Sequence, residues 1–420
     1  MSPSQSSVST VTQWPGEVSG AAACSSEPST MSTPLEHPVA PSAPQTPVFP
    51  NDPHCYSYGR LIGEGGSSKI IKIILKSNQE LRLVAKVNKK EVSHKYAINE
   101  ENILQQLNAV DKKGYVIKWC TGFEVDRRKC SIYERFDYDL RAYLKKGPPS
   151  LPDLFYITNQ LSQAISFVHQ QGFVHGDLKP ENVGIKGRRF YLIDFGESFN
   201  LKTPHSPTSQ FGTPRYLAPE LICSSILNDH PTEQHQAFRN KQMTPALDVW
   251  ALGCTLTEAY RGEYLITDNE VIAAPHTHLQ ERAQSQAMRI LMVIAKNVEP
   301  IPEELFDQGC FSSDKFALRE ACVRPKTPSK FLKLAKLCRK EQCHNSSLSE
   351  LDYRIRDFIC ATLRVDPEKR LKNLLEHQVF HLKVEPQSAA VEPKPQASIE
   401  SQSAAAAAAV EPKPQASASP

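Results

Sequence analysis

Two short motifs in the middle of the chain constrain its fold most strongly. Residues 174–182 read Val-His-Gly-Asp-Leu-Lys-Pro-Glu-Asn, and residues 192–196 follow as Leu-Ile-Asp-Phe-Gly. They supply a loop acid, a lysine, an amide and a second acid at the spacing used for phosphoryl transfer, where catalysis means positioning a hydroxyl and holding phosphate charge. One Asp-Phe-Gly tripeptide would mean little, because many buried turns end in Asp-x-Gly. Two motifs in this order rarely arise by chance.

Each polar residue of the two motifs has an expected role in that chemistry. Asp177 is expected to orient the substrate hydroxyl and accept its proton, and Lys179 to neutralise the transferring phosphate. Asn182 and Asp194 are expected to hold the metal ions that bridge the oxygens of ATP. The motifs therefore predict ATP and Mg²⁺ as cofactors.

Together the motifs resemble the catalytic core of the eukaryotic protein kinases, over about residues 56–381. The resemblance implies a bilobal α+β fold, with a small β-rich N-lobe that carries one main helix (about residues 53–136) and a larger helical C-lobe (about residues 137–383). On either side lie a Ser/Pro/Thr-rich tail, residues 1–52, and an Ala/Pro-rich tail with a ten-residue repeat, residues 384–420. Both tails have few large apolar side chains and are expected to be disordered.

The same resemblance places a phosphate-binding lysine, Lys86, on the third strand of the N-lobe. Its carboxylate partner is expected to be Glu100, because apolar residues follow Glu100 at helical spacing and would pack inward from the same helix. Neighbouring Glu101 lies roughly 100° further around the helix and is expected to be solvated.

The other expected nucleotide contacts lie in a glycine-rich loop and in the linker between the lobes. Residues 61–70 resemble the loop that covers the phosphates, although its third glycine is here Ser68. Tyr133 is the expected gatekeeper, and the backbone that follows it is expected to lie against the adenine. The full set expected to bind nucleotide is Ile62, Gly63, Gly65, Gly66, Ser67, Ser68, Ile70, Ala85, Lys86, Tyr133, Glu134, Phe136 and Asp194.

Three classes of protein stay open on these residues. Small-molecule phosphotransferases of the aminoglycoside and choline kinase type also use a His-Gly-Asp loop, but they lack the Gly-Thr-x-x-Tyr-x-Ala-Pro-Glu platform found at residues 212–220. A pseudokinase acting as a scaffold is disfavoured because the catalytic set is complete. Lys179 followed by proline is typical of kinases that phosphorylate Ser and Thr. We therefore expect an active protein kinase with protein substrates.

Residues 56–69 are similar to the monopolar spindle family of dual-specificity kinases. Gly-Gly-Ser-Ser-Lys in the glycine loop, a residue other than arginine before Asp177 and a short acidic link after Tyr133 carry this similarity. It implies that Tyr is an acceptor besides Ser and Thr, and it implies a role in cell division. The platform at residues 212–220 is an ordinary one and departs from that family.

Composition limits the expected partners and compartment. A net charge of +3 implies no general affinity for nucleic acid or membranes. The 11 cysteines form no Cys-x-x-Cys pair, so we expect reduced thiols in an intracellular protein. No apolar stretch reaches the roughly 18 to 20 residues that span a bilayer. These features predict a soluble protein of the cytoplasm or the nucleus.

Two segments depart from an ordinary kinase sequence. Residues 221–247 are long and polar enough to predict a loop insertion. Residues 315–340 carry many Lys and Arg side chains, which form either a solvated helix face or a docking surface for an acidic partner. The sequence leaves that choice open, and it leaves the oligomeric state unknown.

Overall fold

The computed structural model describes residues 49–89, 94–125, 127–203, 213–226, 233–274, 282–306, 320–324 and 346–384. The compact unit that contains them begins at Phe49. Most of the tail predicted at residues 1–52, and nearly all of the tail predicted at residues 384–420, lie outside the described residues.

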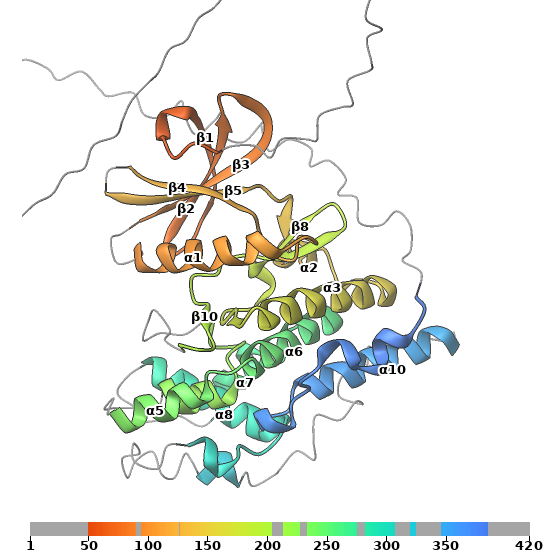
Figure 1. The fold of residues 1–420 in the computed structure, drawn as a ribbon. Coiled ribbons are helices and arrows are strands. Elements are labelled where there is room, and N and C mark those ends of the chain that lie inside the picture. Colours follow the sequence, from red (N-terminus) through yellow and green to blue (C-terminus); the bar gives the residue numbers. More distant parts are fainter. Residues whose placement is uncertain are drawn as a thin grey trace, which may run out of the picture. The chain divides into compact units, whose positions relative to one another are not determined.

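A five-stranded antiparallel sheet with the order β1-β2-β3-β5-β4 forms the N-lobe (Figure 1). A short turn, η1 (Pro53–Cys55), precedes the strands β1 (Tyr56–Glu64), β2 (Ser68–Leu75), β3 (Asn78–Asn88), β4 (Trp119–Val125) and β5 (Arg128–Glu134). Side chains alternate between the two faces of a strand. Leu83 and Ala85 of β3 therefore enter an apolar cluster on one face, whereas Val84 and Lys86 reach the face that the N-lobe helix covers.

That helix, α1 (His94–Val110), lies across the sheet (Figure 1). Ile103, Leu104 and Leu107 are buried, as their helical spacing predicts, and they join the core shared with the C-lobe. Glu100 precedes Leu104 by one helical turn, so it lies on the same inward face. The apolar face of α1 thus orients the glutamate towards Lys86.

The prediction that Glu101 is solvated is wrong. This residue is 7% exposed. Its carboxylate accepts a hydrogen bond from Ser131 Oγ at 2.8 Å and forms an ion pair with Lys129 Nζ at 2.9 Å. The face of α1 that packs against β5 is wider than its apolar stripe, so it also includes Glu101. Ser131 and Lys129 compensate the buried charge of this carboxylate.

The C-lobe is mainly helical, and α3, α6 and α10 pack side by side in it (Figure 1). Ile157, Leu161, Ile165 and Val168 recur at helical spacing and are buried in α3, and the chain leaves this helix through Gly172 at a φ of 82°. The helices are α2 (Leu140–Leu144), α3 (Leu151–Gln170), α4 (Pro219–Leu221), α5 (Glu233–Gln242), α6 (Ala246–Arg261), α7 (Asp268–Ala273), α8 (Arg282–Asn297) and α10 (Ser346–Thr362). Shorter turns are η3 (Pro180–Asn182), η4 (Ile222–Ile226), η5 (Glu303–Leu305), η7 (Pro367–Lys369), η8 (Leu374–Glu376) and η9 (Gln378–His381).

Two small sheets bring the two sequence motifs together. Strand β7 (Phe173–Val174) pairs with β10 (Phe199–Asn200), and β8 (Val183–Lys186) lies between β6 (Tyr138–Asp139) and β9 (Arg189–Leu192). Residues 175–182 connect β7 to β8, and residues 193–198 connect β9 to β10. The paired strands therefore hold both connections, with their polar residues, next to each other.

The interpretation of residues 221–247 as a loop insertion is wrong for the part that the structure describes. A π-helical turn, η4, and the ten-residue helix α5 occupy much of it. Helix α5 is polar, but its Glu, Gln, Ala, Arg and Lys residues have high intrinsic helix propensity. Residues 227–232 lie outside the described residues.

The basic segment 315–340 lies outside the described residues, apart from residues 320–324. There Cys322 is buried, and its carbonyl accepts a hydrogen bond from the N–H of Ile301 at 3.1 Å. Arg324 forms an ion pair with Glu320. The docking surface for an acidic partner stays a prediction.

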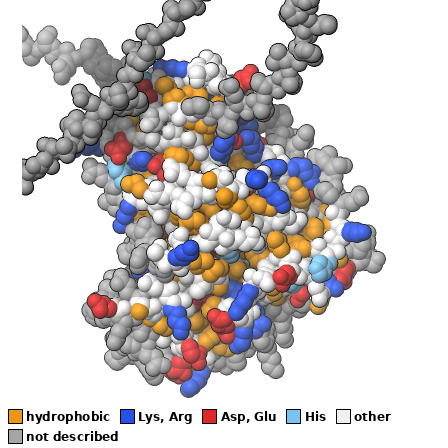
Figure 2. All heavy atoms as spheres, in the orientation of Figure 1, with side chains coloured by type: hydrophobic (Ala, Val, Ile, Leu, Met, Phe, Trp, Pro, Cys, Tyr) orange, Lys and Arg blue, Asp and Glu red, His pale blue; other side chains and the backbone are white. Residues whose placement is uncertain are grey.

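One face of the described part of the chain carries mixed charge. On the face drawn in Figure 2, Lys and Arg side chains are interspersed with Asp and Glu among apolar and uncharged groups. This distribution matches the small net charge of the chain. Within the described part of the chain, no helix is both long enough and apolar enough to span a membrane.

Candidate active site

Lys86, Glu100 and Asp194 form one ion-pair cluster from three different elements. The Nζ atom of Lys86 lies 2.8 Å from Oε2 of Glu100 and 2.8 Å from Oδ1 of Asp194. The other carboxylate oxygen of Glu100, Oε1, accepts a hydrogen bond from the backbone N–H of Phe195 at 3.3 Å. Strand β3, helix α1 and the β9–β10 connection thus meet at one ammonium group.

The two carboxylates share a single ammonium, and the pKa values reflect this. Burial disfavours the charged form of Lys86, but Asp194 and Glu100 outweigh burial and raise its pKa. Partial burial would raise the pKa of Asp194, but Lys86, with smaller contributions from Lys179 and His175, lowers it. Burial raises the pKa of Glu100, and neighbouring Asp194 adds to this despite Lys86. Asp194 is therefore the carboxylate that stays ionised most readily.

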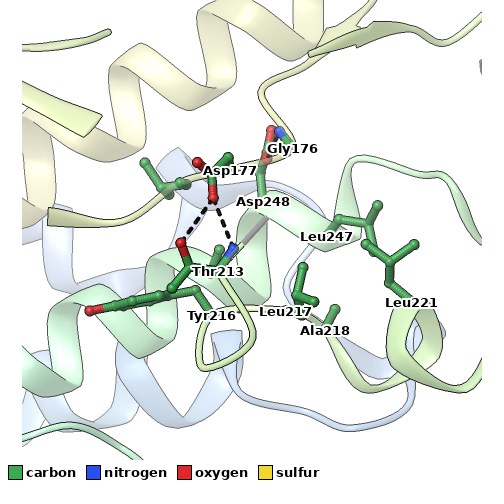
Figure 3. A pocket seen from close by; sticks show the side chains of 11 residues that line it. Gly176, Asp177, Thr213, Tyr216, Leu217, Ala218, Leu221, Leu247 and Asp248 are labelled. Atoms are coloured by element: carbon green, nitrogen blue, oxygen red, sulfur yellow. Dashed lines mark hydrogen bonds between the residues drawn. The ribbon is translucent and has the colours of Figure 1, made fainter. Parts of the chain in front are cut away.

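A second cluster surrounds Asp177. Lys179 Nζ donates to Asp177 Oδ2 at 2.6 Å and to Thr213 Oγ1 at 2.7 Å. The backbone N–H of Thr213 donates to Asp177 Oδ1 at 3.1 Å, and Asn182 Nδ2 donates to Asp177 Oδ2 at 2.9 Å. Both oxygens of the expected catalytic acid are held, as Figure 3 shows for the two bonds to Thr213.

This cluster borders a small pocket (Figure 3). Asp177 and Thr213 face each other on one side of it. Its apolar wall is formed by Leu178, Leu217, Ala218, Leu221, Leu247 and Ala251. The loop that carries Asp177 (residues 175–182, the catalytic loop) and the platform after Thr213 thus meet around this pocket.

Asp248 at the start of α6 anchors the catalytic loop. Its Oδ2 atom accepts the backbone N–H of His175 at 2.8 Å and lies 2.8 Å from Nε2 of His169, while Oδ1 accepts the N–H of Gly176 at 2.9 Å. Burial would raise the pKa of this carboxyl, but His169, His175 and the Gly176 N–H together lower it. Asp248 is therefore an ionised, buried anchor for the loop next to Asp177.

Gly176 is required at its position by space and by backbone conformation. Its φ is 79°, and a Cβ built there would lie 2.7 Å from the carbonyl oxygen of Glu197. The chain between β9 and β10 therefore packs directly on the catalytic loop. A side chain such as arginine before Asp177 would push this connection away.

The glycine loop is the turn between β1 and β2. Of the residues predicted to bind nucleotide, Ile62 and Gly63 lie in β1 and Gly65 follows it. Nothing lies within 4 Å of a Cβ built on Gly65 or Gly66. Lys89 donates to the carbonyl of Gly65 at 2.6 Å, and its N–H donates to the carbonyl of Ser67 at 2.9 Å. Ser68, in the place of the third glycine, is buried, and Ile70 is partly buried against the main core. The loop therefore has free space around Gly65 and Gly66, and the hydrogen bonds from Lys89 hold it to the end of β3.

The remaining predicted nucleotide contacts lie where the sheet joins the C-lobe. Ala85 and Tyr133 are buried in the sheet, and Glu134 ends β5. The Glu134 carboxylate reaches Lys118 and Lys186, each at 3.5 Å, so this side chain is already engaged. Phe136 is half-buried and packs edge-on against Tyr191. These positions stay predictions for nucleotide binding.

The residues present fit a magnesium ion held together with phosphate. Mg²⁺ commonly takes one or two protein carboxylates and completes its shell with substrate phosphates and water. Asp194 is 47% exposed on its side chain, and Asn182 donates through Nδ2, which leaves Oδ1 of its amide as an acceptor. Among the described residues, no three His, Cys, Asp or Glu side chains gather as a metal site. A cation here would depend on the nucleotide for its other ligands.

Sequence reasoning missed several residues that support these clusters. Asn99 donates to the backbone after Asp194, and Ser198 Oγ donates to the carbonyl of His175 at 2.7 Å. His169 contacts Asp248 from the last turn of α3. All three act through long-range contacts, and no motif marks them.

A strand lysine paired with a helix glutamate, beside a loop acid and a second acid, defines a nucleotide-dependent phosphotransferase site. A sequence model of the family described as "Protein kinase domain" matches residues 56–380. The chain belongs to the protein kinase family. Both the predicted kinase resemblance and the bilobal α+β fold are confirmed.

The relatives include kinases of the kind that the glycine loop indicated. The chain is 30% identical to Dual specificity protein kinase TTK of Mus musculus over 207 residues, which cover 48% of this chain and 23% of that protein. It is 26% identical to Serine/threonine-protein kinase MPS1 of Saccharomyces cerevisiae over 282 residues, 64% of this chain and 34% of that protein. The narrower resemblance to the monopolar spindle kinases is confirmed at this level of identity.

Other relatives are more general. Over 224 residues the chain is 27% identical to Cell division control protein 2 homolog 3 of Trypanosoma brucei brucei, covering 51% of this chain and 66% of that protein. The chain thus spans between 23% and 66% of the length of these three relatives. A crystal structure of a kinase domain aligns with a TM-score of 0.57 at 18% identity, covering 78% of this chain and 96% of that one, which supports the fold.

Proposed function

We propose that this chain is an active protein kinase that transfers the γ-phosphate of ATP to Ser or Thr of protein substrates. The observation that carries the proposal is the position of Asp177. Its carboxylate is fixed by Lys179, Asn182 and Thr213 at the edge of a pocket, while Asp194 is held by Lys86 in the adjoining cluster. A pseudokinase would be expected to lack one of these groups.

The residues divide the chemistry between them. Magnesium and ATP would supply the transferable phosphoryl group and screen its charge when bound. Asp177 would orient the acceptor hydroxyl and take its proton as the oxygen bonds to phosphorus and the bond to ADP breaks. Lys179 would hold the charge of the transferring group, Lys86 would bind phosphate oxygens, and Asn182 with Asp194 would ligate the cation.

The acceptor is expected to be Ser or Thr in preference to Tyr. Thr213 binds both Asp177 and Lys179, so the space beside the catalytic acid suits a short hydroxyl side chain. On peptide arrays with Mg²⁺ and ATP, we expect phosphate on Ser and Thr first. Predominant phosphorylation of Tyr would contradict this assignment, whereas a minor Tyr signal would support dual specificity.

Phosphorylation of the segment that follows β10 is expected to modulate activity without being required. Gly176 supplies no basic side chain to bind a phosphate there, and Arg215 is already paired with Asp268 and stacked on Tyr264. Exposed Lys202 is available to a phosphate. The candidate phosphate acceptors are Thr203, Ser206, Thr208 and Ser209, of which the last three lie outside the described residues.

The test of this expectation replaces all four acceptors together by Ala and measures kcat on a peptide substrate. We expect kcat to fall by less than about tenfold. A fall of about a hundredfold or more, some 2.7 kcal/mol in barrier terms, would show that the segment is strictly gated by phosphate. A phosphorylated wild-type sample and a phosphatase-treated one provide the matched comparison.

We further propose a role in cell division, with the cytoplasm or nucleus as the place of action. The name of the Trypanosoma brucei brucei relative, a cell division control protein homolog, supports the role in cell division, whereas the name of TTK, a dual specificity kinase, supports Tyr as a further acceptor. The similarity of the glycine loop to that of the monopolar spindle kinases also supports a role in cell division.

A further inference from the structure

Three consecutive residues of α1 bind three different parts of the molecule. Asn99 Nδ2 donates to the carbonyls of Gly196 and Ser198, at 3.2 and 2.8 Å. Glu100 binds Lys86, and Glu101 binds β5 through Ser131. Successive helix residues point about 100° apart, so these side chains hold α1 over about 200° of its circumference.

The contacts of Asn99 reach the segment that positions the expected metal ligand. Gly196 and Ser198 lie two and four residues after Asp194 in the chain, and the carbonyls of both accept from one amide group. Ser198 Oγ also donates to the carbonyl of His175 in the catalytic loop, at 2.7 Å. Asn99 therefore connects α1 with the Asp194 segment, and Ser198 connects that segment with the loop that carries Asp177.

The contacts of Glu101 fix the opposite side of the helix to the sheet. Besides its bonds to Ser131 and Lys129, the Glu101 carboxylate lies over Gly122 of β4, where a built Cβ would be 2.2 Å from Oε1. The absence of a side chain at Gly122 is what gives this carboxylate room. At the helix start, His94 Nε2 accepts the N–H of Lys129 at 3.3 Å. The sheet thus holds α1 through polar contacts as well as apolar packing.

We propose that Asn99 and Glu101 are positioning residues, which hold α1 so that Glu100 pairs with Lys86 and the Asp194 segment stays on the catalytic loop. Turning α1 to release Glu100 would break the bonds of Asn99 on one side and those of Glu101 on the other. We call Asn99 and Glu101, with the groups that they bind, the clamp. The clamp uses only groups of the folded chain, so it operates without a phosphate on residues 203–209. The inference rests on the proposed kinase function for its kinetic readout.

The first test replaces the amide donor of Asn99 without changing its size. Asn99→Asp places a carboxylate against two carbonyl oxygens, so the two bonds are lost and replaced by repulsion. We expect kcat for peptide phosphorylation to fall about tenfold or more and the KM for ATP to rise, because Lys86 and Asp194 both lose their alignment. Asn99→Ala removes the bonds without the repulsion and should give the same direction with a smaller change.

The matched control is Asn102→Asp, which makes the same chemical change at an exposed position of α1. It should leave kcat and the KM for ATP as in the wild type. On the sheet side, Glu101→Gln keeps an acceptor for Ser131 but loses the charge partner of Lys129, and Gly122→Ala displaces the carboxylate. Glu101→Gln and Gly122→Ala should each lower kcat, as Asn99→Ala does.

A second readout does not depend on catalysis. Hydrogen exchange of the amides at residues 195–198 should become faster in Asn99→Asp and Asn99→Ala, and should stay unchanged in Asn102→Asp. Two outcomes would refute the clamp. In the first, Asn99→Asp keeps the wild-type kinetics and the wild-type exchange rates. In the second, the variants lose activity only in proportion to a lower thermal midpoint, and exchange at residues 195–198 is unchanged. Wild-type protein without kinase activity would overturn the proposed function, while the exchange comparison would still decide the clamp.

Discussion

Asp177→Asn is expected to lower kcat by about a hundredfold to ten-thousandfold, the range typical of a lost general acid or base. That loss corresponds to about 3 to 5 kcal/mol of barrier. The amide occupies the same volume but cannot accept the hydroxyl proton, and it must turn its NH₂ group towards Lys179 or towards the N–H of Thr213. ATP binding should change little, because Lys86 and Asp194 remain.

The experiment measures kcat and nucleotide affinity of the purified variant on a Ser-containing peptide. Asp357→Asn is a matched control, since it makes the same change on α10 at a partly exposed side chain. It should retain wild-type turnover. Near-wild-type kcat in Asp177→Asn would contradict the role assigned to the catalytic acid.

Arg370→Ala is expected to have the largest effect on stability. Arg370 forms a buried bidentate pair with Glu220, at 2.6 and 3.0 Å, and the two side chains are 1% and 0% exposed. Its guanidinium also donates to the carbonyls of Arg364, Ala246 and Val365. Removing it leaves an unpaired buried carboxylate, which costs about 3 to 5 kcal/mol.

Urea unfolding of the purified variant should show this loss of free energy of unfolding. The control is Lys372→Ala, whose ion pair with Glu368 is exposed and should contribute about 0 to 1 kcal/mol. Replacing Arg370 and Glu220 together by Leu should recover part of the loss by removing the lone charge. Three backbone carbonyls would still lack their donor, so recovery should be incomplete. An Arg370→Ala protein as stable as Lys372→Ala would contradict a structural role.

Local patterns predicted the parts of the site that one motif or one periodicity specifies. The spacing of Ile103, Leu104 and Leu107 was enough to orient Glu100, and the structure pairs it with Lys86. The same reasoning was wrong for Glu101, because a helix wheel describes one apolar stripe and does not show that β5 offers Ser131 as a partner.

Long-range contacts explain what the sequence left out. Asn99 binds carbonyls 97 and 99 residues further along the chain, and backbone acceptors leave no mark in a sequence. At Gly176 the sequence showed only that arginine is missing. The structure supplies the reason, since the chain from Glu197 occupies the space that a side chain would need. Helix α5 was missed because its polar residues favour a helix without any apolar periodicity.

The central claim is that this chain phosphorylates Ser and Thr of proteins, and phosphoproteomics of a treated extract tests it most directly. Purified wild-type protein and Asp177→Asn are each incubated with Mg²⁺, ATP and an extract whose own kinases have been inactivated. We expect new Ser and Thr phosphorylation sites, on this chain and on extract proteins, that require the wild type and are absent with the variant. Identical phosphorylation patterns for the two proteins, with ATP bound by both, would contradict the claim and favour a pseudokinase scaffold.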